Sequence, residues 1–503
     1  MSGHRRLTTC LLVLVLGLVC FCHCVGAGQI PCYTSDPNPY RRYSTKSAYA
    51  EIPAVTGGTD TGRSDTVDAD CYPVMIWHLL RHGYRYPADS DIELFNALLP
   101  VFRDNIVANT TVSNQFCAGD LAALRDWKPR MDPSDGSKLV MTGYEEMMRI
   151  AKNFRIKYPT LLNVSIDDML ASFHFRHTDT ERTRESAKSF AKGLLKQPGM
   201  TDQELEALVN RIPMTVYPTT NDRLLRFFDA CERYKKTIRS KPVAELDKFD
   251  NGSIMSEVIA NISRRIGLRQ NMNISVSQSL WLACASEYAI YGLTQDSTVK
   301  NSSAAPWCSV FSQDDLKAFE YRTDLAYYYK NSYGHKLSYE QACPLLKDFI
   351  GSIRNATTKD NFTKVVIRVG HSPTIVPFYA NLGLFKDSRP LTADNFLSQG
   401  NRKLRTSYID PMASNINFVI YKCGNAHKFK MHVNERETTF PGCNGVFCDI
   451  ETLMGSVGKA ADTCDFDQMC KWPIHPSTGG ATRADGAMTF WLMIFSKFLM
   501  PVV

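Results

Sequence analysis

The sequence predicts an α/β fold, in which a mostly parallel central sheet is flanked by helices and a helical domain is inserted into the chain. Three apolar runs of strand length each pass directly into a helical pattern. The long segment between the second and third of these runs carries apolar residues at helical spacing. The composition, 44% hydrophobic and 22% charged, is that of a globular protein and excludes a disordered or collagen-like chain.

Residues 1–27 are typical of a secretory signal peptide. A basic start at residues 4–6 is followed by an apolar run at 11–21 and by small residues up to Ala27, after which we expect cleavage. The apolar run is too short to favour a membrane span, and an uncleaved N-terminal anchor is the alternative.

Residues 477–503 have the pattern of a C-terminal glycolipid-anchor signal, which combines small residues, a polar spacer and an apolar end. The spacing favours Ser477 as the attachment residue, with Gly479 as the second candidate. Lys497 interrupts the apolar end, so a packed C-terminal helix or a membrane span is the alternative.

Cysteine and asparagine patterns agree with export. Of the 16 cysteines, four precede the expected cleavage point and twelve remain. An even number of cysteines in an oxidising compartment indicates disulfides. The chain has no Cys-x-x-Cys pair, so we expect no metal site and no cofactor. Eight Asn-x-Ser/Thr acceptors predict a glycosylated surface: Asn109, Asn163, Asn251, Asn261, Asn273, Asn301, Asn355 and Asn361.

The three strand-to-helix junctions bring the same kinds of side chain to strand ends. The apolar run 74–80 passes into the sequence RHGYRYP at 81–87. The run 170–175 is followed by an arginine-rich helix start that includes Arg182, and the run 365–369 by Gly-His-Ser-Pro at 370–373. Ser372 is the predicted N-cap of the third helix, with Pro373 in its first turn. If these strands share one sheet, arginine and histidine side chains converge at its carboxyl edge.

Arginine and histidine in this arrangement point to phosphate chemistry. A guanidinium offers a planar fork of donors that matches phosphate oxygens, and a helix N-terminus adds backbone N–H groups. A neutral imidazole can attack phosphorus at mildly acidic or neutral pH. The net charge of +7 is not gathered into basic runs, which argues against a nucleic-acid partner and leaves anionic small molecules.

On these residues the chain resembles the histidine acid phosphatases, and within them the multiple inositol polyphosphate phosphatases of the phytase-like branch. The RHGYRYP sequence at 81–87 is the signature, and the resemblance covers roughly residues 32–470. It extends over further segments at 43–49, 182–194, 305–315, 383–393, 415–422 and 433–435.

The resemblance implies a role for five residues. His82 would be the nucleophile that forms a phosphohistidine, and His371 would stabilise the charge of the transferring phosphoryl group. Arg81, Arg85 and Arg182 would bind the phosphate. The implied substrates are inositol polyphosphates, and 2,3-bisphosphoglycerate is a further candidate.

The third motif departs from the family pattern. The family has His-Ala-Glu here and related phytases His-Asp, whereas this chain has Ser372 at the Asp position and Pro373 at the Glu position. Neither side chain is a carboxylic acid, and loss of a positioned general acid lowers a rate by about 10²–10⁴-fold. The proton donor is therefore not identified. A substitute acid, a slow enzyme and a protein that binds phosphate esters without turnover are the three outcomes left open.

The spacing of the motifs sets the expected domains. Residues 28–200 and 350–476 would form the α/β phosphatase domain, and residues 201–349 a helical cap domain. The resulting hypotheses are a secreted or surface phosphomonoesterase for inositol polyphosphates, a surface protein that binds inositol phosphates with a weakened site, and a broad acid phosphatase.

Overall fold

The computed structural model describes residues 39–52, 70–113, 115–293 and 304–472. The predicted signal peptide, the predicted anchor signal, Cys32 and Asn301 lie outside these residues. Within the described ranges, no helix is long and apolar enough to cross a membrane. Of the predicted glycosylation acceptors inside them, Asn261 is half-buried and the other six are exposed. Their modification stays a prediction.

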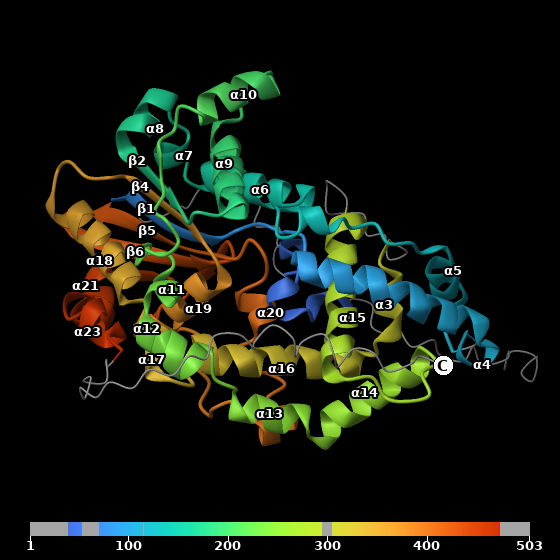
Figure 1. Ribbon diagram of the computed structural model, residues 1–503. Coiled ribbons are helices and arrows are strands. Elements are labelled where there is room, and N and C mark those ends of the chain that lie inside the picture. Colours follow the sequence, from blue (N-terminus) through green and yellow to red (C-terminus); the bar gives the residue numbers. More distant parts are fainter. Residues whose placement is uncertain (1–38, 53–69, 114, 294–303, 473–503) are drawn as a thin grey trace, which may run out of the picture.

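The central sheet has eight strands in the order β3-β2-β4-β1-β5-β6-β7, with β8 paired to β6 (Figure 1). The strands are β1 (Cys71–Arg81), β2 (Phe173–His177), β3 (Met214–Thr215), β4 (Val365–Gly370), β5 (Asn415–Cys423), β6 (Ala426–Val433), β7 (Arg436–Thr438) and β8 (Phe447–Asp449). The predicted α/β class is confirmed, but the sheet is mixed and not mostly parallel as expected: β1 to β4 pair in parallel with one another, whereas β5 to β8 pair antiparallel. A two-residue turn that includes Gly424, with a φ of 59°, connects β5 to β6, and so short a connection returns the chain antiparallel.

The inner strands are buried on both faces, which explains their continuous apolar runs. Residues 75–81 of β1 and all of β4 are buried. Trp77 of β1 packs on Phe349 of α18 (Cys343–Thr358) and Phe378 of α19 (Ser372–Asn381). The neighbouring Ile76 faces a second core with Met147 of α6 (Met141–Lys157) and with α9 (Glu181–Leu195). The sheet is therefore covered by helices on both faces.

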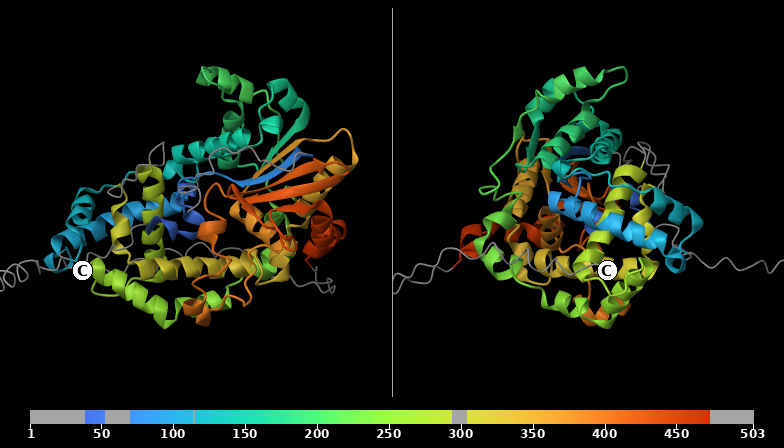
Figure 2. Two further views of the ribbon diagram at one scale, coloured as in Figure 1. Left: turned by 180° about the vertical axis from the view of Figure 1, so that it is seen from behind. Right: turned by 45° about the vertical axis from the view of Figure 1, so that its right-hand side comes forward.

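A group of helices lies beside the sheet region (Figures 1 and 2). These are α3 (Asp89–Ala108), α5 (Ala118–Asp126), α13 (Ala244–Asp250), α14 (Ser253–Arg265), α15 (Ile274–Glu287) and α16 (Gln313–Asn331). The domain division stays a prediction, and two observations bear on it. Helix α3 precedes residue 201 but contacts α15, and β3 lies within 201–349 but pairs with β2.

Helix α10 (Asp202–Val209) follows α9, and the other helices are shorter and lie in the connections. They are η1 (Pro39–Arg41), η2 (Ser44–Lys46), η3 (Tyr49–Glu51), α4 (Thr110–Ser113), η4 (Pro133–Asp135), α7 (Pro159–Leu162), α8 (Ile166–Ser172), α11 (Phe227–Ala230), α12 (Glu232–Tyr234), η5 (Lys235–Arg239), η6 (Tyr288–Gly292), η8 (Pro306–Val310), α17 (Lys336–Glu340), η9 (Ala393–Ser398), α20 (Thr406–Ile409), α21 (Ile450–Leu453), η10 (Met454–Gly458), α22 (Lys459–Asp462) and α23 (Phe466–Cys470).

Disulfides connect distant parts of the chain. The pairs are Cys71–Cys423, Cys231–Cys470, Cys284–Cys308, Cys343–Cys464 and Cys443–Cys448, and Cys117 is also disulfide-bonded. The first joins the start of β1 to the end of β5. The pairs of Cys464 and Cys470 hold the late helices to the middle of the chain, as expected of cross-links that constrain long loops.

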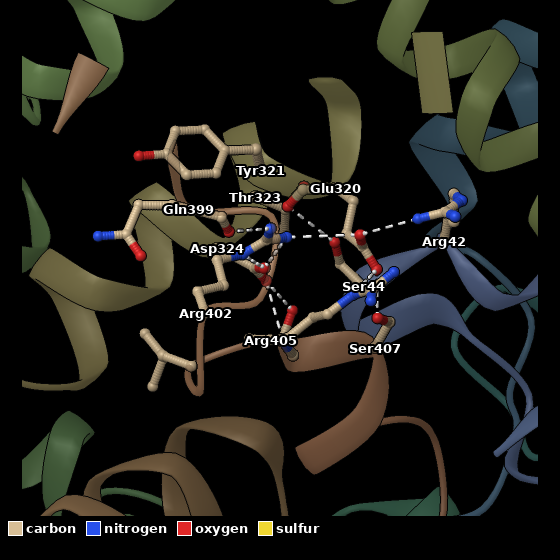
Figure 3. Close-up of polar contacts among 12 residues, drawn as sticks. Arg42, Ser44, Glu320, Tyr321, Thr323, Asp324, Gln399, Arg402, Arg405 and Ser407 are labelled. Carbon is tan, nitrogen blue, oxygen red and sulfur yellow. Dashed lines mark hydrogen bonds and ion pairs between the residues drawn. The ribbon is translucent and has the colours of Figure 1, made fainter. Parts of the chain in front are cut away.

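A buried ion cluster on α16 holds the segments around the end of β1 (Figure 3). Asp324 accepts from Arg402 Nε at 2.6 Å, and Glu320 lies 3.4 Å from Arg402 Nη2 and 3.0 Å from Arg405 Nε. Arg42, just before η2, lies 3.8 Å from Glu320. Both carboxylates are almost fully buried, so each depends on these partners.

Hydroxyl groups extend the same cluster to η2 and α20. Ser44 donates to the backbone oxygen of Glu320 at 3.3 Å. On α20, Thr406 donates its backbone N–H to Asp324 at 3.0 Å, and Ser407 donates to the Glu320 carboxylate. Helix α16 therefore fixes both η2 and α20, which flank the end of β1.

Candidate active site

His82 directly follows β1 and is buried, with 4% of its surface exposed. Its Nδ1 lies 2.9 Å from the Gly83 carbonyl oxygen, which can only accept, so Nδ1 carries the proton and Nε2 keeps its lone pair. Burial, together with the charges of Arg81, His371 and Arg182, holds the pKa of His82 well below its usual value. The imidazole is therefore neutral and has the electronic form of a nucleophile.

Close backbone packing positions the loop after His82. A Cβ on Gly83 would lie 2.4 Å from the Gly143 oxygen at the start of α6, so only glycine fits. Gly83 donates its N–H to Ser186 Oγ of α9 at 3.0 Å. The buried Glu146 of α6 accepts the N–H of Tyr84 at 3.1 Å. Helices α6 and α9 thus hold the loop from the same face of the sheet.

His371 follows β4, which lies between β1 and β2. Its ring centroid is 5.5 Å from that of His82. Thr178 Oγ1 lies 2.8 Å and Arg226 Nη1 3.1 Å from His371 Nε2. Because a guanidinium can only donate, Nε2 is the acceptor and the proton is on Nδ1. Burial and the charges of Arg182 and Arg226 hold the pKa of His371 well below its usual value.

Two arginines present buried donors that have no acceptor among the described residues. Arg81 is 3% exposed, and its Nη1 donates to the backbone oxygens of Thr45 at 2.8 Å and Asp410 at 2.7 Å. Its Nε, like the Nε of Arg182, has no hydrogen-bond partner in the part of the chain that the structure describes. Buried donors without acceptors are costly, and phosphate oxygens would satisfy them.

The arginines lie close enough to perturb one another. Burial and the charges of Arg85, Arg226 and Arg81 lower the pKa of Arg182 to about 10. Burial and the charge of Arg81 also lower the pKa of Arg85. The same causes, burial first and then Arg85 and Arg81, lower the pKa of Lys46 on η2. Such an excess of buried positive charge is the environment that binds a phosphate dianion.

The structure brings together all five residues that the sequence singled out, which are Arg81, His82, Arg85, Arg182 and His371. It adds four that the sequence did not reveal: Lys46, Thr178, Arg226 and Asp410. No motif or spacing in the sequence indicates a site role for Arg226 or Asp410. Lys46 lies in the segment 43–49 that carries the resemblance, but nothing in that segment assigned it a role. Across the described ranges, no group of three or more His, Cys, Asp or Glu side chains is placed to hold a metal ion.

One local prediction at the third motif is wrong. The N-cap of α19 is His371 and the helix begins at Ser372, one residue earlier than predicted. The Ser372 hydroxyl does not cap the helix because it donates instead to the carboxylate of Asp410. Thr374 Oγ1 accepts the N–H of His371 at 3.1 Å.

Comparison with known proteins places the chain among phosphatases. The family model described as histidine phosphatase superfamily (branch 2) matches residues 75–437. A Drosophila melanogaster protein named multiple inositol polyphosphate phosphatase 1 is 28% identical over 92% of this chain and 95% of its own length. The human protein of that name is 28% identical over 88% of this chain and 91% of its own.

Solved structures show the same fold. The phytase from D. castellii superimposes with a TM-score of 0.66 at 16% identity, covering 87% of this chain and 90% of that one. The multiple inositol polyphosphate phosphatase of Bifidobacterium longum, in complex with inositol hexasulfate, gives a TM-score of 0.60 at 15% identity, covering 84% and 98%.

Proposed function

Since the chain belongs to the histidine phosphatase superfamily (branch 2), we propose that it is a phosphomonoesterase that hydrolyses inositol polyphosphates through a phosphohistidine at His82. One observation carries the proposal: the free Nε2 of a neutral His82 lies beside His371 and a group of arginines with unpartnered donors.

The reaction follows from this geometry. His82 Nε2 attacks phosphorus, the bond from phosphorus to the ester oxygen breaks, and the alcohol leaves with a proton. Arg81, Arg85 and Arg182 neutralise the phosphoryl oxygens, and positioning with charge neutralisation is the main requirement of phosphoryl transfer. Water then attacks the phosphohistidine and releases phosphate. His371, neutral and held by Thr178, donates from Nδ1 to the transferring group.

The substrate class rests on charge and on the relatives. The buried arginines lie close enough to lower one another's pKa, and Arg226 adds a cation to those that one phosphate needs. A polyphosphorylated ring would engage them together. The names of the Drosophila and human relatives, and the inositol hexasulfate bound to the Bifidobacterium longum protein, support inositol polyphosphates as the class.

A second function is favoured by one observation, the proline at the position of the family's acid. Pro373 lies in the first turn of α19 and has no proton to donate. A surface protein that binds inositol phosphates without turnover would keep the arginines and need no acid. A broad acid phosphatase is the third hypothesis, and the choice of substrate separates it from the first.

The test is phosphate release by the purified protein from inositol hexakisphosphate and from p-nitrophenyl phosphate, between about pH 4 and 8. We expect turnover of both, with preference for the inositol substrate, and none in His82→Ala, which keeps its fold by circular dichroism. Binding of inositol hexakisphosphate without release of phosphate would favour the binding protein. Release from His82→Ala at wild-type rates would refute the nucleophile.

We also propose that the protein enters the secretory pathway and is held at the cell surface by a glycolipid at Ser477 or Gly479, residues outside the described ranges. Treatment of cells with a phospholipase specific for glycolipid anchors should release the protein. Attachment that persists, while a known anchored protein is released, would contradict the anchor.

A further inference from the structure

Asp410 is a carboxyl group that lies next to the site and has no part in the mechanism above. It follows α20 directly and its side chain is fully buried. Its Oδ2 accepts from Ser372 Oγ and lies 3.7 Å from Arg81 Nη1. Its Oδ1 accepts from Ser414 Oγ at 2.8 Å. The carboxyl therefore touches both the phosphate-binding arginine and the residue beside His371.

The surroundings of α20 fix this carboxyl. The ion cluster on α16 binds Ser407 (Figure 3) and also Thr406, so the helix that ends one residue before Asp410 is held at two successive positions. The Asp410 backbone oxygen also accepts from Arg81. A side chain with this many supports keeps one orientation, as proton transfer requires.

Ser372 lies beside the two histidines of the site. It is the first residue of α19 and directly follows His371, whose ring lies 5.5 Å from that of His82. Its hydroxyl can donate one proton while accepting another. Asp410 is fully buried, and of the two serine hydroxyls on its carboxyl, only that of Ser372 belongs to the residue next to His371.

We propose that Ser372 and Asp410 form a proton relay that replaces the carboxylic acid missing at Pro373. The inference rests on the proposed phosphatase function and names the source of the proton in that reaction. Asp410 acts through Ser372, which is the group that contacts the leaving oxygen.

The proton that Asp410 gives up in the first half-reaction returns to it in the second. With a proton on Asp410, Oδ2 donates to Ser372 Oγ and the serine hydroxyl turns to the ester oxygen, which reverses the donation from Ser372 that the structure shows. As His82 Nε2 bonds to phosphorus and the bond from phosphorus to the ester oxygen breaks, that oxygen takes the Ser372 Oγ proton, and Ser372 takes the proton of Asp410 Oδ2. Asp410 is left as a carboxylate beside Arg81. When water attacks the phosphohistidine, its proton returns through Ser372 to Asp410, and the His82 nitrogen recovers its lone pair.

The electrostatic environment favours the protonated form of Asp410 more than water does. Burial raises the pKa of Asp410, although Arg81, the two serine hydroxyls and Lys46 act in the opposite direction. Charged or titratable groups face it from three elements: Arg81 on β1, Lys46 on η2 and Tyr379 on α19. The raised pKa supports a group that is protonated before reaction and ionised after it.

The experiment compares two leaving groups in the purified full-length mature protein. Nitrophenolate leaves without a proton, whereas an inositol alkoxide needs one. We expect Ser372→Ala and Asp410→Asn to lower kcat/KM for inositol hexakisphosphate by about 10²-fold or more relative to any loss on p-nitrophenyl phosphate. Ser372→Thr keeps the hydroxyl and should retain most activity on both. Ser414→Ala, which removes the other hydroxyl on the same carboxyl, should affect both substrates alike.

The outcomes separate the relay from the proposed function. Equal losses on both substrates would overturn the relay and make Asp410 only a counter-ion of Arg81, with the phosphatase function intact. Wild-type turnover of p-nitrophenyl phosphate alone would also overturn it, since no proton reaches the inositol oxygen. Turnover of neither substrate would refute the proposed function and the relay together. If Asp410→Asn does not fold, the contrast between Ser372→Ala and Ser372→Thr decides.

Discussion

Replacing Arg226 by methionine tests whether the charge beside His371 contributes to the reaction. Arg226 Nη1 lies 3.1 Å from His371 Nε2, and its Nε is held by Asp229 at 2.7 Å. Methionine has similar length without the charge. A charge-assisted hydrogen bond contributes about 1.5–3 kcal/mol. If that bond is made in the transition state, Arg226→Met lowers kcat/KM by about 10- to 150-fold.

A neighbouring arginine provides the matched control. Arg239 Nη1 also pairs with Asp229, at 2.5 Å, but its side chain is 49% exposed. Arg239→Met therefore removes the same kind of ion pair and should leave kcat/KM for inositol hexakisphosphate nearly unchanged.

The assay is steady-state phosphate release over a range of pH. Because Arg226 lowers the pKa of His371, the methionine variant should also lose activity at a higher pH than the wild type as the solution is acidified. Equal rates for wild type and Arg226→Met, or equal losses in the two variants, would refute the reasoning.

Three further outcomes follow from the structure. Burial and nearby charges hold the pKa of His82 well below its usual value, so kcat/KM should persist as pH falls through about 6.5 and decline only at lower pH. A loss of activity centred near pH 6.5 would count against a neutral buried nucleophile. Gly83→Ala should lower the melting temperature and abolish turnover because its Cβ would overlap a backbone oxygen. The control is Gly119→Ala, at an exposed helix position with no atom within 4 Å of the added Cβ, which should leave the free energy of unfolding unchanged or raise it by up to about 1 kcal/mol. Asp324→Ala should lower the free energy of unfolding in urea by about 3–5 kcal/mol, since Arg402 stays buried without that partner, and a loss below about 1 kcal/mol would contradict this.

The sequence was most informative where local pattern and burial agree. The apolar runs that form β1 and β4 are buried on both faces, which makes each run continuously apolar in the sequence. The histidine that follows each strand could therefore be identified as a candidate site residue. The start of helix α10 is also set locally, because Thr201 and Glu204 form a capping box there.

Residues whose role depends on distant contacts could not be found in this way. Arg226 reaches His371 across 145 positions of the chain, and Asp410 reaches Ser372 across 38. No periodicity relates such pairs. The N-cap of α19 was misplaced for the same reason, because the carboxylate that engages Ser372 lies in another segment. The antiparallel half of the sheet likewise depends on a turn at Gly424 rather than on any strand pattern.

The position of β1 within the sheet has a consequence for synthesis of the chain. Its two neighbours, β4 and β5, both lie late in the sequence, so β1 emerges from the ribosome with neither edge paired. Roughly 290 further residues must be added before β4 is complete, which takes about 15–60 s at ordinary elongation rates. During that interval the largely buried strand β1 and the histidine that follows it have no partner strand on either side. We expect such a nascent chain to need that strand shielded from aggregation, and the phosphate site can form only near the end of translation.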